Sequence, residues 1–593
     1  MRWRRESSLS SVVLSRPKCP ASHTAHHFPL KDKGQNNGFV SLFLLLYGKR
    51  KSAAPTGSQL ALYVEETRPL MVLISLFFFM LALCGFPASS YFISVFCLRT
   101  TGSSGTIIIK CKDLRILQLD IPGMEECLNI ASSIEALSSL ESVAVMYPFF
   151  HRPRELSLKD PRGLSSPEQD YTQTERLWDR WRLSKVNSDF SVCPSYPDTL
   201  IVPSSIDDDT LIKAARFRQG GRFPVLCYCH HRNSMVIMRS SQPLTGANRK
   251  RCREDELLLQ AVIDESEMGY VVDTRSAQQA QQARMTGGGF ESKSCYQNWK
   301  RLHRHMERGK VLQESLIKLV EACGDPSHNM DRWLSKLENS KWLTHVHSAL
   351  STAGLVAECV ERDSHSVLVH GSEGTDTTLL VTTVAQLILD PASRTFRGFL
   401  ELLEKEWVQA GHPFQLRCAR SAYSHARLRQ ECPSFLLLLD CVWQLWRQFP
   451  LALEFSEALL LRLAQEAYAS DYGTFLCNNE QERGSFGVRE NTHCLFQFLL
   501  NCAEREQYIN PLYEPTDLAI WPSVQPQSLQ LWTGLFLRWT EHAENMNEAR
   551  EEIWTIVKEH TERTGPVETT HTPLKHCDTF SAMENLTDEL TIL

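Results

Sequence analysis

Residues 366–378 read SVLVHGSEGTDTT, the pattern of a strand, a glycine-containing turn and the start of a helix. A turn of this kind presents backbone amides to which a phosphate can bind. The side chains do not complete such a site, because the turn carries Glu373 and Asp376 and no cysteine, lysine or arginine. A nucleotide-triphosphate loop is excluded too, since its GxxxxGK[ST] pattern requires a lysine. The turn has the shape of an anion cradle without the groups that would hold or attack the anion.

Two interpretations of the turn stay open at the level of its residues. In the first, it is a folded remnant: Gly371 and Gly374 permit tight bends, and Thr377 and Thr378 cap the following helix. Asp376 would then lie favourably near the positive end of that helix. In the second, the backbone amides retain weak contact with a phospholipid. The first interpretation is favoured for the residues themselves.

The sequence gives less support to a serine nucleophile, a metal site or disulfide bonds. Ser372 has no base beside it in the sequence, and an unassisted hydroxyl is a poor nucleophile. The run CYCHHR at 227–232 has no second pair of ligands at a metal-like spacing, so we expect no metal and no cofactor. The 19 cysteines are scattered, and several, such as Cys441, lie in apolar runs. We therefore expect reduced, buried thiols in a cytosolic domain.

The elements that would position the turn alternate between strand and helix patterns over residues 181–540, which predicts a layered α/β domain. The predicted strands are 223–229, 235–240, 269–275 and 366–370. The predicted helices are 254–264, 306–322, 343–360, 377–389, 398–409, 435–448 and 455–468. A chain of 593 residues with 42% apolar and 22% charged residues is ordinary for globular proteins. Its net charge of −6 argues against a general nucleic-acid binder.

The first 101 residues differ from the rest. Residues 1–51 hold ten Lys or Arg against two acids, and residues 69–98 carry no charge. We expect either a membrane span at 70–98, since about 20 apolar residues cross a bilayer, or an error in the gene model. Residues 105–122 then predict a β-hairpin, and 123–140 a helix, which together look like the end of a larger β-domain. An error is favoured, because a sheet cut in the middle leaves an exposed edge.

The C-terminal region predicts one further helix. Over residues 541–560, Met546, Ala549, Ile553 and Ile556 are spaced three and four apart, as at the start of a coiled coil. A terminal helix lying on the domain is about equally favoured. Two heptads rarely form a stable dimer in isolation, and the tail beyond residue 561 is polar and Thr-rich.

Six motifs in register carry a resemblance to the myotubularin family, over roughly residues 102–540. They are FRQGGRFPVLCYCH with MVIMRSSQPLTG, GYVVDTRS with GGGFE, NMDRWLSKLENSKWLTH, TFRGFLELLEKEWVQAGHPF, FLLLLDCVWQLWRQFPLALEFSE and LQLWTGLFLRW. The resemblance implies a cysteine-phosphatase-like α/β fold of the protein tyrosine phosphatase superfamily. It further implies a truncated N-terminal PH-GRAM β-domain and a C-terminal helix. The implied domains are 1–101, 102–145 as the PH-GRAM remnant, 160–540 as the phosphatase-like domain and 541–593.

Active members of this family resemble cysteine-dependent phosphatases of 3-phosphorylated inositol lipids. Their loop carries a cysteine nucleophile and a phosphate-gripping arginine, and the positions here are His370, Gly371, Ser372, Glu373, Gly374, Thr375, Asp376, Thr377 and Thr378. Gly371 stands at the cysteine position and Thr377 at the arginine position. Pro413 replaces a basic residue of the GH-x-F motif, whereas Arg417 persists as a candidate phosphoinositide contact. The resemblance therefore implies an inactive member with no catalytic residues.

In this family, inactive members pair with active ones through a coiled coil and raise their activity or stability. The resemblance thus implies a regulatory subunit, cytoplasmic and peripheral on endosomal or endoplasmic-reticulum membranes. Its expected partners are active myotubularin-related lipid phosphatases, as heterodimers or with a second copy, through Met546, Ala549, Ile553 and Ile556. A phosphoinositide-binding scaffold and a residual lipid phosphatase are the alternatives. No nucleic-acid partner is expected.

Overall fold

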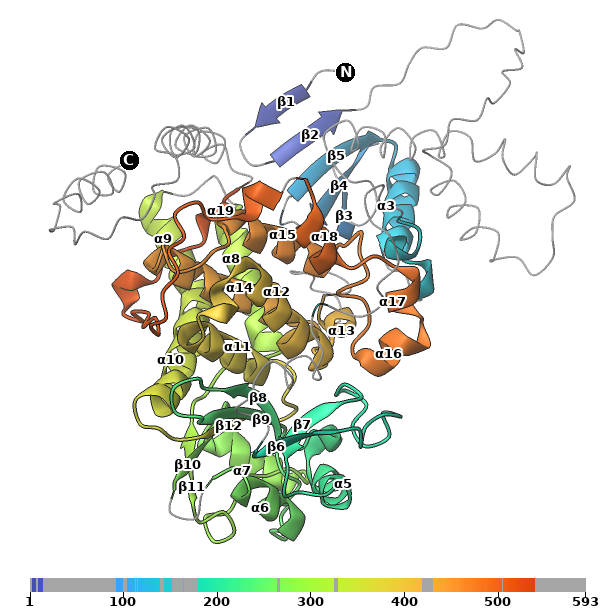
Figure 1. Ribbon diagram of the computed structural model, residues 1–593. Coiled ribbons are helices and arrows are strands. Elements are labelled where there is room, and N and C mark those ends of the chain that lie inside the picture. The colour runs from blue at the N-terminus through green and yellow to red at the C-terminus, as the bar shows by residue number, and fades with distance from the viewer. Residues whose placement is uncertain are drawn as a thin grey trace, which may run out of the picture. The chain divides into compact units, whose positions relative to one another are not determined.

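The computed structural model describes residues 3–6, 9–13, 92–99, 104–111, 114, 116–138, 143–151, 164, 179–263, 267–324, 329–418, 430–503 and 505–538. Its main body is the layered α/β domain predicted from the alternation of elements (Figure 1). The predicted partner-binding residues Met546, Ala549, Ile553 and Ile556 lie outside the described residues.

A five-stranded sheet in the order β11-β10-β12-β9-β8 forms the centre of this domain. The strands are β8 (Val225–Cys229), β9 (Val236–Ser240), β10 (Gly269–Asp273), β11 (Trp299–His303) and β12 (Val367–His370). All neighbours are parallel except β8, which pairs antiparallel with β9. The four predicted strands are confirmed as β8, β9, β10 and β12. A second, two-stranded sheet pairs β6 (Trp181–Ser184) with β7 (Leu200–Pro203).

Both faces of the central sheet are buried, which explains the continuous apolar run of β12. Val367 and Val369 join the large core cluster on one face, whereas Leu368 joins a second cluster on the other. Figure 1 shows α10 and α11 on one side of this sheet and α6 on the other. Parallel sheets are covered by helices on both faces in this way.

The described helices of the main body are numerous and mostly short. They are α5 (Asp208–Phe217), α6 (Arg253–Gln260), α7 (Ala277–Met285), α8 (Lys310–Cys323), α9 (Met330–Ser340), α10 (Trp342–Glu361), α11 (Thr377–Leu389), α12 (Phe396–Leu403), α13 (Phe414–Cys418), α14 (Ser434–Gln448), α15 (Glu457–Tyr468), α16 (Glu480–Ser485), α17 (Val488–Asn491), α18 (Leu495–Asn501) and α19 (Thr533–Phe536). The predicted helix 398–409 begins as α12 and continues as a π-helical segment, Glu404–Gln409.

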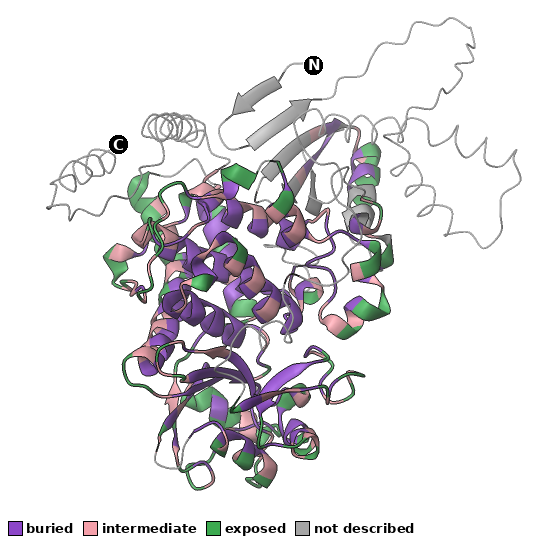
Figure 2. Cartoon of the chain, in the orientation of Figure 1, coloured by how far each residue is buried: buried purple, intermediate pink, exposed green. Residues whose placement is uncertain are grey.

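Helix α11 is buried along its whole length, as Figure 2 shows in the middle of the domain. A helix that is apolar on every side belongs in a core. Two of its threonines bond to the helix backbone: Thr383 Oγ1 donates to the Leu379 carbonyl at 2.7 Å, and Thr382 Oγ1 donates to the same carbonyl at 3.2 Å. The helix that follows the turn is therefore fixed in position by packing.

Asp440 of α14 is a fully buried carboxyl group. It accepts hydrogen bonds from Trp342 Nε1 at 2.7 Å and from Gln444 Nε2 at 3.0 Å. Burial raises the pKa of Asp440 to about 6, more than these two hydrogen bonds lower it. The contribution of Asp440 to the free energy of unfolding is therefore fully present below the ordinary carboxyl pKa. This contribution is lost as the pH rises through about 6.

We compare the free energy of unfolding of Asp440→Asn with that of the parent chain. As the pH rises from about 4 to about 7, we expect this difference to shift by about 3 kcal/mol in favour of the variant. The amide cannot ionise, so the variant escapes the loss that the carboxyl group suffers. Urea unfolding at a series of pH values measures the difference. Parallel stability profiles for the two chains would contradict a buried titration at Asp440.

The N-terminal part forms a separate five-stranded sheet in the order β1-β2-β5-β4-β3. Its strands are β1 (Trp3–Glu6), β2 (Leu9–Val13), β3 (Phe92–Arg99), β4 (Ser104–Cys111) and β5 (Ile116–Pro122), followed by α3 (Met124–Ser138). The predicted hairpin is the antiparallel pair β4–β5, and the predicted helix is α3. The sheet extends beyond the predicted remnant 102–145, because β1, β2 and β3 precede residue 102.

Strand β3 bears on the interpretation of residues 70–98. The interpretation as a gene-model error rested on an exposed edge of the sheet at this point. Strand β3 pairs antiparallel with β4, so this edge of β4 is covered. Residues 92–98 of the candidate span are strand, and residues 70–91 lie outside the described residues. Within the described part of the chain, no helix combines the length and apolar character needed to cross a bilayer.

Candidate functional site

The turn predicted to carry the site joins β12 to α11, at the carboxyl edge of the central sheet. The ends of β9, β10 and β12 lie in register there, at Ser240, Asp273 and His370. The backbone also fixes the turn, since Gln242 N donates to the Ser372 carbonyl at 3.1 Å. Ligands of α/β sheets bind at this edge, so the turn occupies the expected place for a site.

Three threonine hydroxyl groups surround the position that a side chain at residue 371 would occupy. A Cβ atom added to Gly371 would stand 2.7 Å from Thr274 Oγ1, 3.4 Å from Thr377 Oγ1 and 3.6 Å from Thr378 Oγ1. Thr274 Oγ1 and Thr377 Oγ1 also share a hydrogen bond of 2.8 Å. The position that a nucleophilic side chain would need is therefore occupied by a buried hydroxyl pair.

This arrangement corrects the prediction that Thr377 and Thr378 cap α11. The residue at the N-cap is Asp376, and no side chain caps the helix there. The Thr377 hydroxyl is instead paired with Thr274, on the neighbouring strand end, and Thr378 Oγ1 makes no hydrogen bond with any described residue. Thr377 thus bonds to a residue that is distant in the sequence and does not cap its own helix.

Asp376 lies at the N-cap of α11, near the positive end of the helix as predicted, and its carboxylate pairs with Arg417. Arg417 Nε donates to Asp376 Oδ1 at 2.9 Å and Nη2 to Oδ2 at 2.8 Å, while Ser434 Oγ donates to Oδ1 at 2.9 Å. Burial acts to raise the pKa of Asp376, but the charge and hydrogen bonds of Arg417 outweigh it and hold the pKa well below its ordinary value. The carboxylate is therefore ionised and fully engaged.

Arg417 is the predicted phosphoinositide contact, and its donors are used inside the protein. Besides the bidentate pair with Asp376, its Nη1 donates to the Gln430 carbonyl at 2.7 Å. Glu373 lies farther away, at 3.8 Å from Nη2, and is exposed. A phosphate at this position would have to compete with Asp376 for the guanidinium group, and the contact stays a prediction.

His412 gives the turn no positive charge. It is fully buried, and its Nδ1 lies 2.8 Å from the Thr375 carbonyl, which fits a neutral ring donating from Nδ1. Burial lowers the pKa of His412 to about 4, despite the opposing charge of Asp376. Pro413 follows and adds no charge, so Arg417 is the cation that borders the turn from this segment.

A buried charge network beneath the turn was missed by the sequence analysis. His370 Nε2 lies 3.0 Å from Glu291 Oε2, and Glu291 Oε1 accepts from Arg218 Nη1 at 2.7 Å. Arg218 also forms two hydrogen bonds to Asp255, at 2.7 and 2.8 Å, and Tyr296 donates to Asp255 at 2.6 Å. Arg218 and Glu291 do lie within two of the quoted motifs, FRQGGRF and GGGFE, which is the signal that could have found them.

The network determines the charge state of Glu291. Burial acts to raise its pKa, but His370 and Arg218 together outweigh burial and hold it well below the ordinary value. Arg218 keeps its proton because Asp255 and Glu291 more than compensate its burial. The network thus clamps the end of β12, the strand from which the turn begins.

Gly374 is the residue of the turn that needs to be glycine. Its φ is +74°, and an added Cβ atom would lie 2.4 Å from the Ser240 carbonyl oxygen. Its own carbonyl accepts from Arg222 Nη2 at 2.9 Å. The backbone of β9 and a buried arginine therefore hold the bend in one shape.

We expect Gly374→Ala to lower the free energy of unfolding by about 3 kcal/mol, from a strained φ together with an overpacked contact. Gly220→Ala is the matched control, since Gly220 has a φ of +63° and no atom within 4 Å of an added Cβ. The control should cost only about 1 kcal/mol, the strain alone. Equal losses in urea unfolding would show that contact with Ser240 does not constrain the turn.

The side chains of the turn differ from those of a phosphate-binding loop. Gly371 offers no nucleophile, Thr377 is neutral, and no histidine or carboxylate among the described residues bonds to the Ser372 hydroxyl. The same part of the chain contains no cluster of three or more metal-ligating side chains, and its cysteines form no disulfides. The contacts of the turn with β9, Arg222 and Arg417 hold its shape.

Comparison with known proteins gives consistent matches. Residues 146–484 match the model of the myotubularin-like phosphatase domain. The chain is 57% identical to Myotubularin-related protein 9 of Mus musculus over 460 residues, which cover 78% of this chain and 84% of that protein. It is 54% identical to the Homo sapiens protein of the same name over 486 residues, covering 82% and 88%. A more distant relative, at 36% over 419 residues, is Phosphatidylinositol-3-phosphate phosphatase MTMR7 of Homo sapiens, covering 70% and 63%.

Proposed function

Because this chain belongs to the myotubularin family, we propose that it is a catalytically inactive member that binds active myotubularin phosphoinositide 3-phosphatases and raises their activity or stability. One observation carries the proposal: the space for a nucleophile at residue 371 is taken by the bonded hydroxyls of Thr274 and Thr377. A thiolate is the nucleophile of cysteine-dependent phosphatases, and glycine cannot replace it.

The folded main body of the chain supports a role that depends on the fold and does not need the reaction. The central sheet and the buried helix α11 are complete, and the turn is held by Arg417, Arg222 and the Arg218 network. The family also supplies candidate partners, since human MTMR7 is named a phosphatidylinositol-3-phosphate phosphatase. Such a partner shares the fold and would bring the chemistry that this chain lacks.

The proposed contact is the helix over residues 541–560, through Met546, Ala549, Ile553 and Ile556, as in a short coiled coil. Pairing with a longer helix of the partner would offset the brevity of two heptads. Through such partners the chain would act at endosomal or endoplasmic-reticulum membranes.

Co-expression with MTMR7 tests the proposal. We expect the two chains to purify together, and phosphate release from phosphatidylinositol-3-phosphate per MTMR7 molecule to rise. Ile553→Asp/Ile556→Asp should abolish both effects, because charges would enter the apolar stripe. Asn547→Asp/Thr555→Asp adds the same charge off the stripe and should abolish neither. Failure of the folded parent chain to associate with MTMR7 or its close active relatives would overturn the regulatory role.

The two alternatives have less support. A phosphoinositide-binding scaffold would use Arg417, whose guanidinium is already paired with Asp376. A residual phosphatase would need a nucleophile, and Ser372 has no described base. Phosphate release by the purified chain alone, above background and lost in Asp376→Ala, would revive the second alternative.

A further inference from the structure

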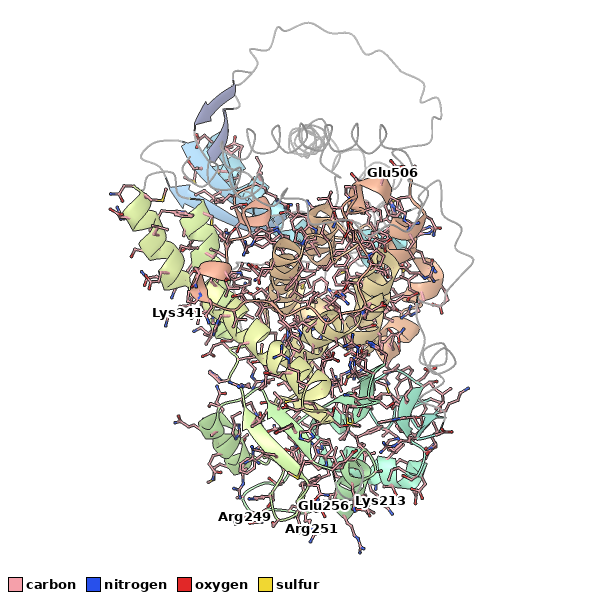
Figure 3. The ribbon with its side chains drawn as sticks, turned by 60° about the vertical axis from the view of Figure 1, so that its left-hand side comes forward. Lys213, Arg249, Arg251, Glu256, Lys341 and Glu506 are labelled. Atoms are coloured by element: carbon pink, nitrogen blue, oxygen red, sulfur yellow. The ribbon has the colours of Figure 1, made fainter. Side chains whose placement is uncertain are left out.

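A cluster of exposed cations lies away from the turn, where the chain passes from β9 to α6. Arg249, Lys250, Arg251 and Arg253 are all exposed. Figure 3 shows Arg249 and Arg251 at one end of the main body, with Lys213 and Glu256 close by. We call Arg249, Lys250, Arg251 and Arg253 the basic loop.

The acidic residues near the basic loop are already paired, which leaves most of its charge unopposed. Glu256 accepts from Arg251 at 2.7 Å, and Glu254 lies 3.9 Å from Lys213 Nζ. Arg249, Lys250 and Arg253, in contrast, form no ion pair with any residue that the structure describes. Three cations of the loop thus remain free for an external anion.

The backbone holds the basic loop in place. Lys250 N donates to the Thr245 carbonyl at 2.7 Å, which closes the turn, and Gly246 N donates to the Gly288 carbonyl at 2.9 Å. These bonds join the basic loop to the segment that follows α7. The charges are therefore presented on an ordered turn, at a low cost in entropy on binding.

Apolar side chains accompany the charges. Met285, at the end of α7 and three residues before Gly288, is 74% exposed. Leu257 is 43% exposed and lies one helical turn from Arg253, on the solvent face of α6. Exposed apolar side chains beside lysines and arginines are typical of surfaces that lie in the headgroup region of a membrane.

We propose that the basic loop, with Met285 and Leu257, is a docking surface for a membrane rich in anionic lipids. Arg249, Lys250 and Arg253 attract the headgroups, and the two apolar side chains enter the interface. An acidic protein is the less favoured partner, because the protruding apolar side chains would face charge instead of hydrocarbon. The surface does not include residues 370–378 or Arg417, so the proposal is independent of the regulatory role.

Vesicle sedimentation with the full chain tests the proposal. Vesicles of phosphatidylcholine with a third of phosphatidylserine are compared with phosphatidylcholine alone. We expect binding to the anionic vesicles only, and its loss at about 1 M salt, where the Debye length falls to about 3 Å. Arg249→Gln/Lys250→Gln/Arg253→Gln should weaken partitioning on the order of 100-fold, at about fivefold for each cation near the surface. Met285→Ser should weaken it several-fold.

The matched control removes three exposed cations elsewhere, on or beside α8 and α9: Lys318→Gln/Arg332→Gln/Lys341→Gln. It has the same net charge, and Figure 3 shows Lys341 away from Arg249. We expect nearly parental binding from this control, and unchanged co-purification with MTMR7 from both triple variants. Equal losses in the two triple variants, parental binding by the basic-loop variant, or binding to a soluble polyanion such as heparin without binding to anionic vesicles would each overturn the proposal.

Discussion

Replacement of Arg417 by alanine is expected to lower the free energy of unfolding by about 3–5 kcal/mol, the usual cost of removing one partner from a buried ion pair. The loss would leave Asp376, whose side chain is 10% exposed, without the two hydrogen bonds of the guanidinium group. Ser434 would remain as a single neutral donor. Urea unfolding of the purified chain measures the change.

Two controls separate this effect from a general loss of charge. Arg417→Ala/Asp376→Ala should recover part of the stability, because no unpaired carboxylate is left behind. Arg397→Ala removes an arginine from an exposed i,i+4 pair with Glu401 and should cost less than about 1 kcal/mol. If Arg417→Ala cost no more than Arg397→Ala, the guanidinium would be available to a ligand, and the scaffold alternative would gain ground.

Arg218→Ala should cost at least as much, about 4–5 kcal/mol, because one substitution strands two buried carboxylates. Asp255 would lose both hydrogen bonds from the arginine, and Glu291 would keep His370 as its charged or polar side-chain neighbour. The deficit should shrink as the pH falls, since an unpaired buried carboxylate takes up a proton more readily than a paired one. Unfolding in urea at neutral and mildly acidic pH measures both effects.

Arg216→Ala is the matched control, since Arg216 lies two residues before Arg218, in the last turn of α5, and is exposed. Its cost should stay within about 0.5 kcal/mol, as for most surface substitutions. A deficit for Arg218→Ala that is small, or that does not change with pH, would mean that the network contributes little to holding the end of β12.

The sequence predicted the parts of the site that depend on local pattern. The apolar run before His370 and the long apolar stretch after Asp376 predicted β12 and α11, because both elements are surrounded by core. Strand β11 was missed, since its sequence WKRLH is polar at the edge of the sheet, where the faces are less buried. Helices α5 and α7 were missed as well; both are short, and Ala280 is the buried residue of α7.

The partners of the site residues could not be predicted, because they come from distant parts of the chain. Thr377 was expected to serve its own helix, and it bonds instead to Thr274, 103 residues away. Asp376 lies at the helix end as predicted, but its pairing with Arg417, 41 residues away, was not predicted. The sequence predicted which residues form the turn. Which side chains bond to one another depends on how distant segments pack, and this could not be predicted.

The hydroxyl pair between Thr274 and Thr377 has a consequence for the history of the protein. A mutation that placed cysteine at position 371 would bring its Cβ atom within 2.7 Å of Thr274 Oγ1, so that one of the two residues would have to shift. Arginine at position 377 would in turn deprive Thr274 of its bonded neighbour. On the proposed function, recovery of activity would thus require coordinated changes after β12, after β10 and at the start of α11. On the proposed function, the residues around position 371 therefore make a return to catalysis by a single substitution unfavourable.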